Sequence, residues 1–295
     1  MTDPSNLVLQ AIAGLTFGLI LFLVASGLTL IFGVMRILNF AHGVLYMLGA
    51  YFAFSVTRWF SDTPAKFIIA LILAPLMGAA LGLAIEFLLL RRIYRRAHLD
   101  QLLLTFALVF IAADGTRLTW GVDFKSVDVP PFLTGSVSLL GRSFPSYYFL
   151  VWAIAILVAV ALWAFVQRTR TGLLLRAIVQ DREMAGALGV NTARIYTATF
   201  MLGAYLAALG GALVAPLRAV ALDLATESII EAFIIVVIGG LGSVFGALVG
   251  ALLLGESNAF GALVAPRFAI VFPFVLMAVV LIVRPFGLFG QPESE

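Results

Sequence analysis

The chain has 295 residues, of which 63% are apolar and only 11% are charged, and its mean hydropathy is +1.13. This composition excludes a soluble globular protein and indicates an integral membrane protein. The net charge is +3 and the pI is about 9.4, which we attribute to arginines held on one side of a bilayer rather than to nucleic-acid binding. The chain has no cysteine and two histidines. Thiolate chemistry and disulfides are therefore excluded, and we expect no metal or other cofactor.

Apolar runs long enough to cross a bilayer, about 20 residues each, recur along the whole chain. They predict an all-α polytopic membrane bundle with eight to nine spans, ten at most, some short or broken, in a single transmembrane domain over residues 1–295. The run at 229–255 is interrupted by Gly239, Gly240 and Gly242, so it is either one span or two half-helices. The eight predicted spans cover residues 7–32, 40–56, 67–90, 102–120, 147–166, 195–217, 229–255 and 268–283.

Arginines in the connecting loops predict the orientation of the chain. Four arginines lie within residues 91–96 and five within residues 168–194, and both loops fall on the same side as Arg36. Positively charged short loops are retained in the cytoplasm. We therefore expect residues 167–194 to be cytoplasmic and the N-terminus to be outside.

The loop at 121–146 falls on the outer side in this topology. It contains Pro130, Pro131 and Gly135 and alternating stretches, which predict a small hairpin that caps the bundle. Two roles remain open for it, a solvated connector and a docking surface for an extracellular partner.

Charged residues are scarce inside the predicted spans. Glu86 lies about one turn from Arg91 and is expected to reach the membrane interface. Glu231 and Glu256 bracket the glycine-rich run, where a structural explanation is less obvious, although each can also sit at headgroup level. Because no series of buried acids suggests a proton relay, the sequence argues against an ion-coupled pump.

No enzyme motif is present. The only lysines, Lys66 and Lys125, fall in outer loops, which excludes an intramembrane serine–lysine protease, and the two histidines are too far apart for a zinc protease motif. The phosphate-binding loop motif of ATPases is also absent, so any dependence on ATP must come from a partner.

Two polar segments stand out. In residues 33–43, Arg36, Asn39 and His42 recur every three residues, and if this segment is helical they form one polar stripe. The spacing alone favours an interfacial helix with its polar face among the headgroups. The second segment, residues 168–194, has helix formers through 173–188, followed by Gly189 and Asn191 as a helix stop, and suits a protein partner.

Together with the glycine-rich run, these segments resemble the signatures of branched-chain amino-acid ABC transporter permeases. Within the second segment, Glu183, Ala185 and Gly189 also match a loop of ABC importer permeases that seats in the ATPase, with Met184 where that loop has alanine. The matches follow the family's order along the chain: NFAHG and YMLGAY within 39–51, Arg176 to Asn191, and VVIGGLGS with GA within 236–247.

The resemblance implies the smaller of two permease subunits in an importer of the bacterial-type inner membrane. A periplasmic or lipid-anchored binding protein would deliver branched-chain amino acids to this chain and a second permease subunit. Two ATP-binding cassette subunits would bind ATP and drive alternating access, so the chain itself would not be an enzyme. Alternatives are a urea or short-amide importer permease of the same family and, from a different class, a partner-free secondary carrier or channel.

The resemblance also implies roles for individual residues. Coupling to the ATPase would involve Arg176, Asp181, Glu183, Ala185 and Gly189. The matched signature segments also suggest candidates for the translocation pathway, and we hypothesise that they contact the substrate: Asn39, His42, Gly239, Gly240 and Gly242.

Overall fold

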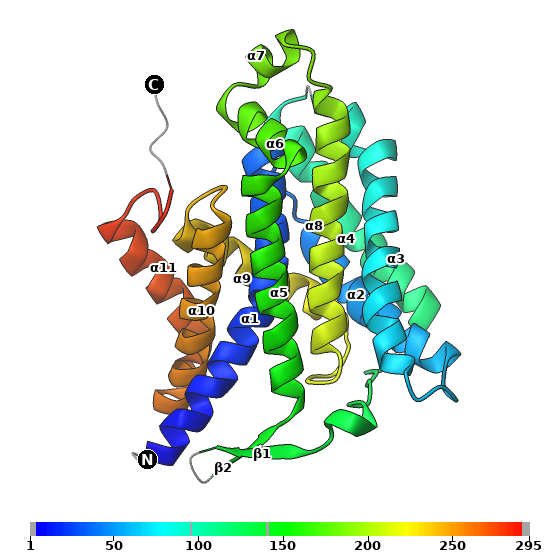
Figure 1. The fold of residues 1–295 in the computed structure, drawn as a ribbon, viewed down its shortest axis with the longest axis vertical. Helices are drawn as coiled ribbons and strands as arrows, with labels where there is room; N and C mark the ends of the chain where they lie inside the picture. The colour runs from blue at the N-terminus through cyan, green and yellow to red at the C-terminus, as the bar shows by residue number, and fades with distance from the viewer. Residues whose placement is uncertain (1–3, 95, 140–141, 291–295) are drawn as a thin grey trace.

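The computed structural model describes residues 4–94, 96–139 and 142–290; Arg95, which belongs to the first arginine-rich loop, lies outside the described residues, as do residues 140–141 of the outer loop. The described part contains eleven α-helices and one two-stranded sheet (Figure 1). The helices are α1 (Pro4–Met35), α2 (His42–Trp59), α3 (Lys66–Leu88), α4 (His98–Trp120), α5 (Tyr147–Arg168), α6 (Arg170–Gln180), α7 (Arg182–Ala187), α8 (Thr192–Val214), α9 (Leu224–Gly239), α10 (Val244–Val264) and α11 (Phe272–Val283).

Seven helical segments of the described residues are long and apolar enough to cross a membrane. The predicted count of eight to nine spans is therefore not confirmed as a number, because α9 has only 16 residues and α2, with 18, is less apolar than the seven. The interrupted run at 229–255 is two helices, since α9 ends at Gly239 and α10 begins at Val244. The seven segments are Asn6–Met35, Lys66–Arg92, His98–Trp120, Tyr147–Arg168, Thr192–Val214, Val244–Val264 and Pro266–Val283.

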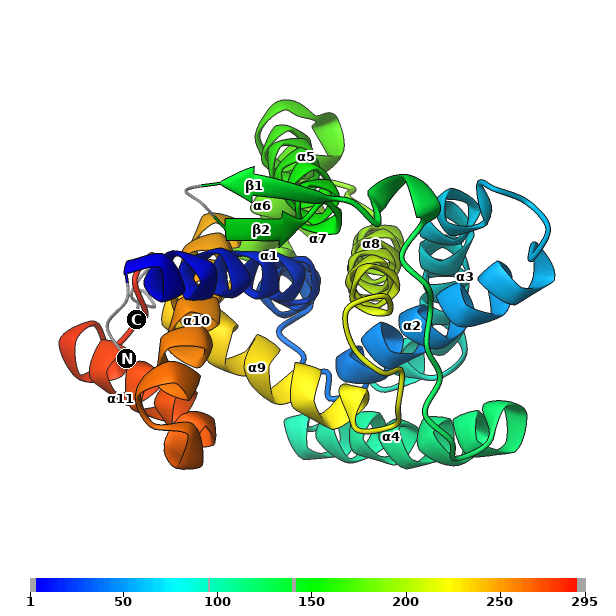
Figure 2. The same ribbon diagram turned by 90° about the horizontal axis from the view of Figure 1, so that it is seen from below.

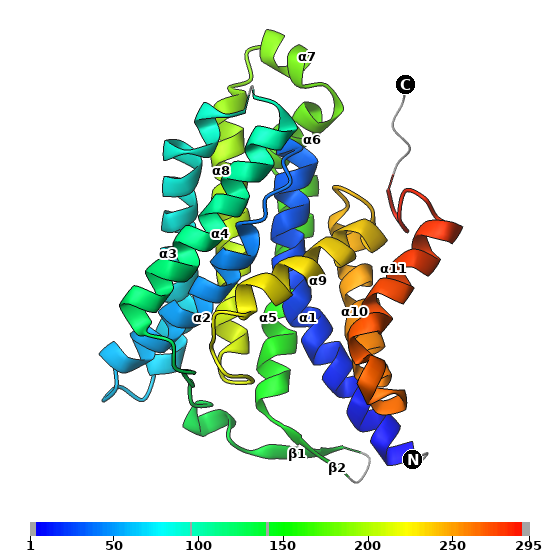
Figure 3. The same cartoon turned by 180° about the vertical axis from the view of Figure 1, so that it is seen from behind.

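The buried centre of the bundle is formed by α1 and α8, with α2, α9 and α10 packed against them (Figures 2 and 3). In the most apolar stretch of α8, 72% of residues are buried, against 11% in α4 and in the segment that includes α11. The peripheral helices expose large apolar side chains such as Phe110 and Ile282. Such a surface is stable in lipid and identifies these helices as the bilayer-facing ones.

Glycine allows the central helices to approach closely. A Cβ added at Gly49 of α2 would lie 2.2 Å from the Ala208 carbonyl oxygen of α8, which is closer than atoms can pack. In lipid no hydrophobic effect drives helices together, so close contact between small residues supplies the packing energy.

The two ends of the bundle differ. Helices α6 and α7 project from one end, and the N-terminus lies at the other, beside the hairpin of β1 (Ser136–Leu139) and β2 (Arg142–Pro145) (Figure 1). The strands are antiparallel, with Val137 opposite Phe144. An isolated antiparallel bridge between Lys125 and Val220 ties the outer loop to the segment after α8. We refer below to the α7 end and the hairpin end.

Candidate translocation pathway and coupling surface

The connection between α1 and α2 enters the interior of the bundle. Helix α1 stops at Met35 because Arg36 adopts a φ of +53°, the only positive φ of a non-glycine residue in the described part of the chain. Residues 36–41 are not helical. The expected interfacial polar stripe is therefore wrong: Arg36 is exposed, whereas Asn39 and His42 are fully buried.

His42 is held against the middle of α1. Its Nε2 lies 2.9 Å from the Val24 carbonyl oxygen. Because a carbonyl only accepts, Nε2 carries the proton and Nδ1 is the acceptor of the neutral ring. Val24 precedes Met35 by about 16 Å along the helix, at about 1.5 Å per residue. Helix α2 thus begins inside the bundle rather than at its surface.

Several buried polar atoms, including those of Asn39 and His42 at this helix start, have no partner among the described residues. Both polar atoms of the Asn39 amide, the His42 Nδ1 and the Thr29 hydroxyl are buried without a hydrogen bond. Each such group costs about 1 to 3 kcal/mol, whereas the His42, Val44 and Leu45 amides at the start of α2 already donate to the Asn39 and Ala41 carbonyls. This region therefore offers donors and acceptors to the polar groups of a small solute.

The glycine-rich turn between α9 and α10 has a different environment. Gly240 and Gly242 have φ values of +96° and +82°, which favour glycine. The Leu288 and Phe289 amides donate to the Ile238 and Gly239 carbonyls at 2.8 and 3.0 Å. The C-terminal segment thus clamps this turn, and close packing explains its glycines.

Helix α9 connects the two groups of predicted pathway residues. A Cβ at Gly43, beside His42, would lie 2.1 Å from the Ala225 carbonyl at the start of α9, whereas Gly239 ends the same helix. Asn39 and His42 are brought together, and the glycines lie at the far end of α9. Their contact with substrate stays a prediction.

The predicted coupling residues lie in α6 and in the tip around α7. Asp181 caps α7, because its Oδ1 accepts a 2.9 Å hydrogen bond from the Met184 amide. Arg176 of α6 donates to the Gln167 side chain. Glu183 is exposed on the first turn of α7.

The far side of the tip presents apolar side chains to the surroundings. Ala185 is buried, whereas Met184 and Leu188 are 57% and 78% exposed. Gly189, with a φ of +86°, ends the turn, and the Val190 amide returns to the Ala185 carbonyl at 3.1 Å. Exposed apolar residues on a folded projection are typical of a protein-binding surface.

A buried carboxylate at the α7 end lies beneath the tip. Glu86 does not reach the membrane interface as expected: it is fully buried and accepts hydrogen bonds from the Tyr94 and Thr197 hydroxyls, at 2.5 and 2.7 Å. Burial and the hydrogen bond to Glu86 raise the pKa of Tyr94, which therefore stays a donor. Tyr94 packs edge-on against Tyr196 of α8. This cluster links α3 to α8, and sequence spacing gave no signal for it, because its partners come from three separate segments.

At the hairpin end, an ion pair joins the segment after α8 to α9. Arg218 Nη2 lies 2.7 Å from Glu227 Oε2. Burial lowers the pKa of Arg218, but the hydrogen bond and charge of Glu227 outweigh it and leave a net increase. One turn along α9, Glu231 accepts a 3.3 Å hydrogen bond from Asn258 of α10. Arg218 directly follows a predicted span, and its position in the sequence therefore did not indicate a functional role.

Glu256, the second acid beside the glycine-rich run, lies between α10 and α1. Within the described part of the chain, one oxygen of Glu256 is buried without a hydrogen-bond partner, and a Cβ at Gly14 would lie 2.9 Å from that atom. The carboxylate thus sits where two backbones approach closely.

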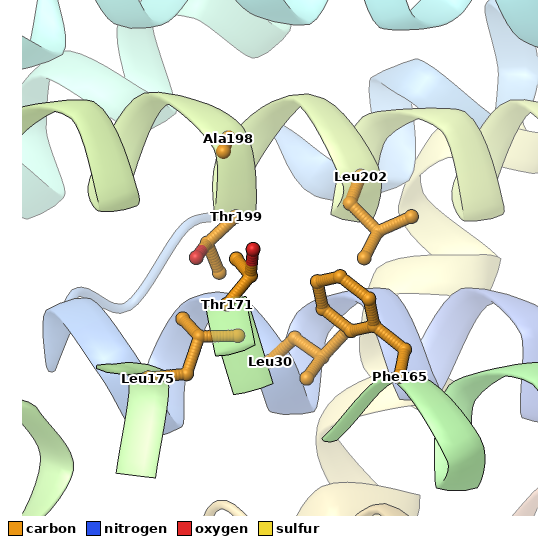
Figure 4. Close-up of a pocket in the computed structure, with 7 residues that line it drawn as sticks. All are labelled: Leu30, Phe165, Thr171, Leu175, Ala198, Thr199 and Leu202. Carbon is orange, nitrogen blue, oxygen red and sulfur yellow. The ribbon is translucent and has the colours of Figure 1, made fainter. Parts of the chain in front are cut away.

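A small pocket at the base of the tip lies between α1, the α5–α6 segment and α8 (Figure 4). Its volume is about 10 Å³. Because one water needs roughly that much space, the pocket is too small for an amino acid. The mainly apolar walls hold α6 closely against the central helices through Leu30, Phe165, Thr171, Leu175, Ala198, Thr199 and Leu202.

Spanning helices arranged around a short helix that starts inside the bundle define a multi-pass membrane protein of the kind that transporters use. Residues 10–283 match the family model described as branched-chain amino acid transport system / permease component. The chain therefore belongs to this permease family.

Individual relatives match over nearly the full length. The branched-chain amino acid permease protein LivH of Salmonella typhimurium is 32% identical, with 97% of this chain and 96% of LivH covered. BraD of Pseudomonas aeruginosa is 32% identical with the same coverage. The probable LivH of Methanocaldococcus jannaschii is 26% identical over 92% of this chain and 89% of that protein.

Among solved structures, PsaBC from Streptococcus pneumoniae in complex with Fab has a TM-score of 0.47 and 12% identity, with 94% of this chain and 92% of that chain covered. This likeness is too distant to support a conclusion.

Proposed function

We propose that this chain is a transmembrane subunit of an ATP-driven importer that carries branched-chain amino acids across the inner membrane by alternating access. The observation that carries the proposal is similarity across the whole chain: LivH and BraD, named as permeases of high-affinity branched-chain amino acid transport systems, match 97% of it.

The interior suits such a substrate. An aliphatic side chain needs no fixed charge along its path, and few ionisable groups lie in the core. The zwitterion needs donors and acceptors, which the unpaired side-chain atoms of Asn39 and His42 supply. These contacts are few, so passage through the permease is weakly held and high affinity belongs to the binding protein.

The α7 end suits contact with cytoplasmic ATPase subunits. Its exposed Met184 and Leu188 offer an apolar docking face, and Glu183 adds a charge beside them. The arginine-rich loops lie at this end, which supports a cytoplasmic α7 end and an N-terminus outside. The complete importer then contains a second permease subunit, two ATP-binding cassette subunits and a substrate-binding protein at the hairpin end.

Uptake by cells that lack the gene tests the proposal. Complementation with the intact chain should restore ATP-dependent uptake of radiolabelled leucine, isoleucine and valine. Restored uptake of urea or acetamide without leucine would overturn the substrate assignment in favour of an amide importer. Undiminished leucine uptake after removal of the ATPase genes would overturn the importer itself in favour of a partner-free carrier.

A further inference from the structure

A cavity of about 200 Å³ opens at the hairpin end between α1, α5 and the segment after α8. Its apolar wall includes Ala13 and Phe17 of α1 and Val214 of α8. Three polar side chains, Thr16, Tyr148 and Arg218, also line it. This cavity is separate from the helix start at Asn39 and His42.

The cavity has the size of a small aliphatic molecule. In another protein, an apolar cavity of about 150 Å³ holds benzene, which has six carbon atoms. A cavity of about 200 Å³ therefore accommodates the branched side chain of leucine or isoleucine. Ligand sites of this kind combine apolar walls with a few convergent polar groups.

Arg218 has binding capacity left after its ion pair. A guanidinium has five N–H donors, and the one hydrogen bond of this side chain within the described residues is that of Nη2 with Glu227. The side chain is 35% exposed, so it is accessible from the hairpin end. Guanidinium groups bind carboxylates with two parallel hydrogen bonds.

Two acidic side chains of α9 lie near Arg218, although neither lines the cavity. Glu227 is 48% exposed, and Glu231 follows one turn later on the same face of α9. Asn258 donates to only one oxygen of Glu231. Arg218, which lines the cavity, is thus paired with Glu227 at the end of the molecule that faces the incoming substrate in the proposed orientation.

We propose that this cavity is a receiving site for the zwitterion of an aliphatic amino acid. Arg218 binds the α-carboxylate, its ion-pair partner Glu227 binds the ammonium group, and the walls around Ala13 take the side chain. The substrate exchanges ion pairs with Arg218 and Glu227 rather than adding a net charge, which keeps binding weak enough for onward passage. The inference rests on the proposed function and adds a second site ahead of Asn39 and His42.

Saturation-transfer NMR on the assembled transporter in deuterated-lipid nanodiscs, without the binding protein, tests the site with L-leucine as the probe. We expect saturation of the leucine methyl signals. Replacement Arg218→Gln should weaken leucine binding at least 10-fold, while Arg117→Gln, which removes an equivalent ion pair with Asp114 at the same end, should leave it unchanged. Equal binding in the two variants would overturn the assignment of Arg218.

The apolar wall has its own matched pair. Ala13→Phe fills the cavity and should abolish leucine saturation transfer, whereas Ala153→Phe, at an exposed position of α5, should not. Ligand analogues test the charged groups: isoamylamine, which lacks the carboxylate, should compete at least 10-fold less well than leucine in the wild type and equally well in Arg218→Gln. If neither Ala13→Phe nor Arg218→Gln changes leucine binding, the proposal of a receiving site is wrong.

The two proposals fail differently. In proteoliposomes with the binding protein and ATP, the wild type should accumulate leucine, and Arg218→Gln should slow accumulation. If the wild type accumulates leucine and the variants bind and transport it normally, only the receiving site is refuted. If the wild type accumulates no branched-chain amino acid, the proposed function fails as well.

Discussion

Gly189 offers a sharp test of the α7 tip because its neighbour Gly186 provides an internal control. An added Cβ meets no atom within 4 Å at either position, so neither substitution creates a clash. Gly189 has a φ of +86°, at which a β-branched residue such as valine costs about 1 to 2 kcal/mol or more. Gly186 lies in helix α7, where alanine is favoured by about 0.5 to 1 kcal/mol.

Gly189→Val should therefore lower the ratio of native to non-native tip by about 5- to 30-fold, and it should weaken the affinity for the ATPase subunits by up to the same factor. Gly186→Ala should retain or improve that affinity, and Gly189→Asn should lose little, because asparagine tolerates positive φ. Biolayer interferometry of the purified ATPase on nanodisc-embedded permease measures this directly. Equal affinity of Gly189→Val and the wild type would refute the reasoning that the native turn presents the docking face.

Three further predictions concern the interior. Asn39→Ala should reduce leucine uptake at least 10-fold while the melting temperature stays the same or rises, because the Asn39 side-chain amide makes no hydrogen bond to any residue that the structure describes. Unchanged uptake would indicate a purely structural residue. Glu86→Gln should destabilise the permease by about 1 to 3 kcal/mol, because it weakens the hydrogen bonds from Tyr94 and Thr197, and an unchanged denaturation midpoint would contradict this. Gly49→Val should lower the free energy of unfolding by about 1 to 3 kcal/mol or prevent folding, because a larger side chain would force the closely packed helices α2 and α8 apart. Size-exclusion profiles and melting curves measure this effect. A melting curve like that of the wild type would argue against close packing of the two helices.

Local composition predicted much of the fold. The apolar runs and the break at Gly239–Gly242 correspond to helices and to the turn between α9 and α10, because span length and glycine conformation are local properties. Similarly, Pro130, Pro131 and Gly135 anticipated the loop that ends in the β1–β2 hairpin.

Local composition did not predict how deeply each segment is buried in the bundle. The three-residue spacing of Arg36, Asn39 and His42 favoured a surface helix, but Arg36 ends α1 and the chain then turns into the bundle. The depth of His42 depends on the Val24 carbonyl of a different helix, which accepts a hydrogen bond from His42 Nε2. Glu86 was placed at the interface for the same reason, since its partners Tyr94 and Thr197 become neighbours only through packing.

The central claim is that this chain forms the path of an ATP-driven importer for branched-chain amino acids. The most direct test measures radiolabelled leucine inside proteoliposomes that contain the purified transporter, with binding protein on the hairpin side and ATP on the α7 side. The account predicts accumulation above the external concentration, which stops when ATP is omitted or when this chain is left out. Leucine that only equilibrates, or that accumulates without ATP, would contradict it.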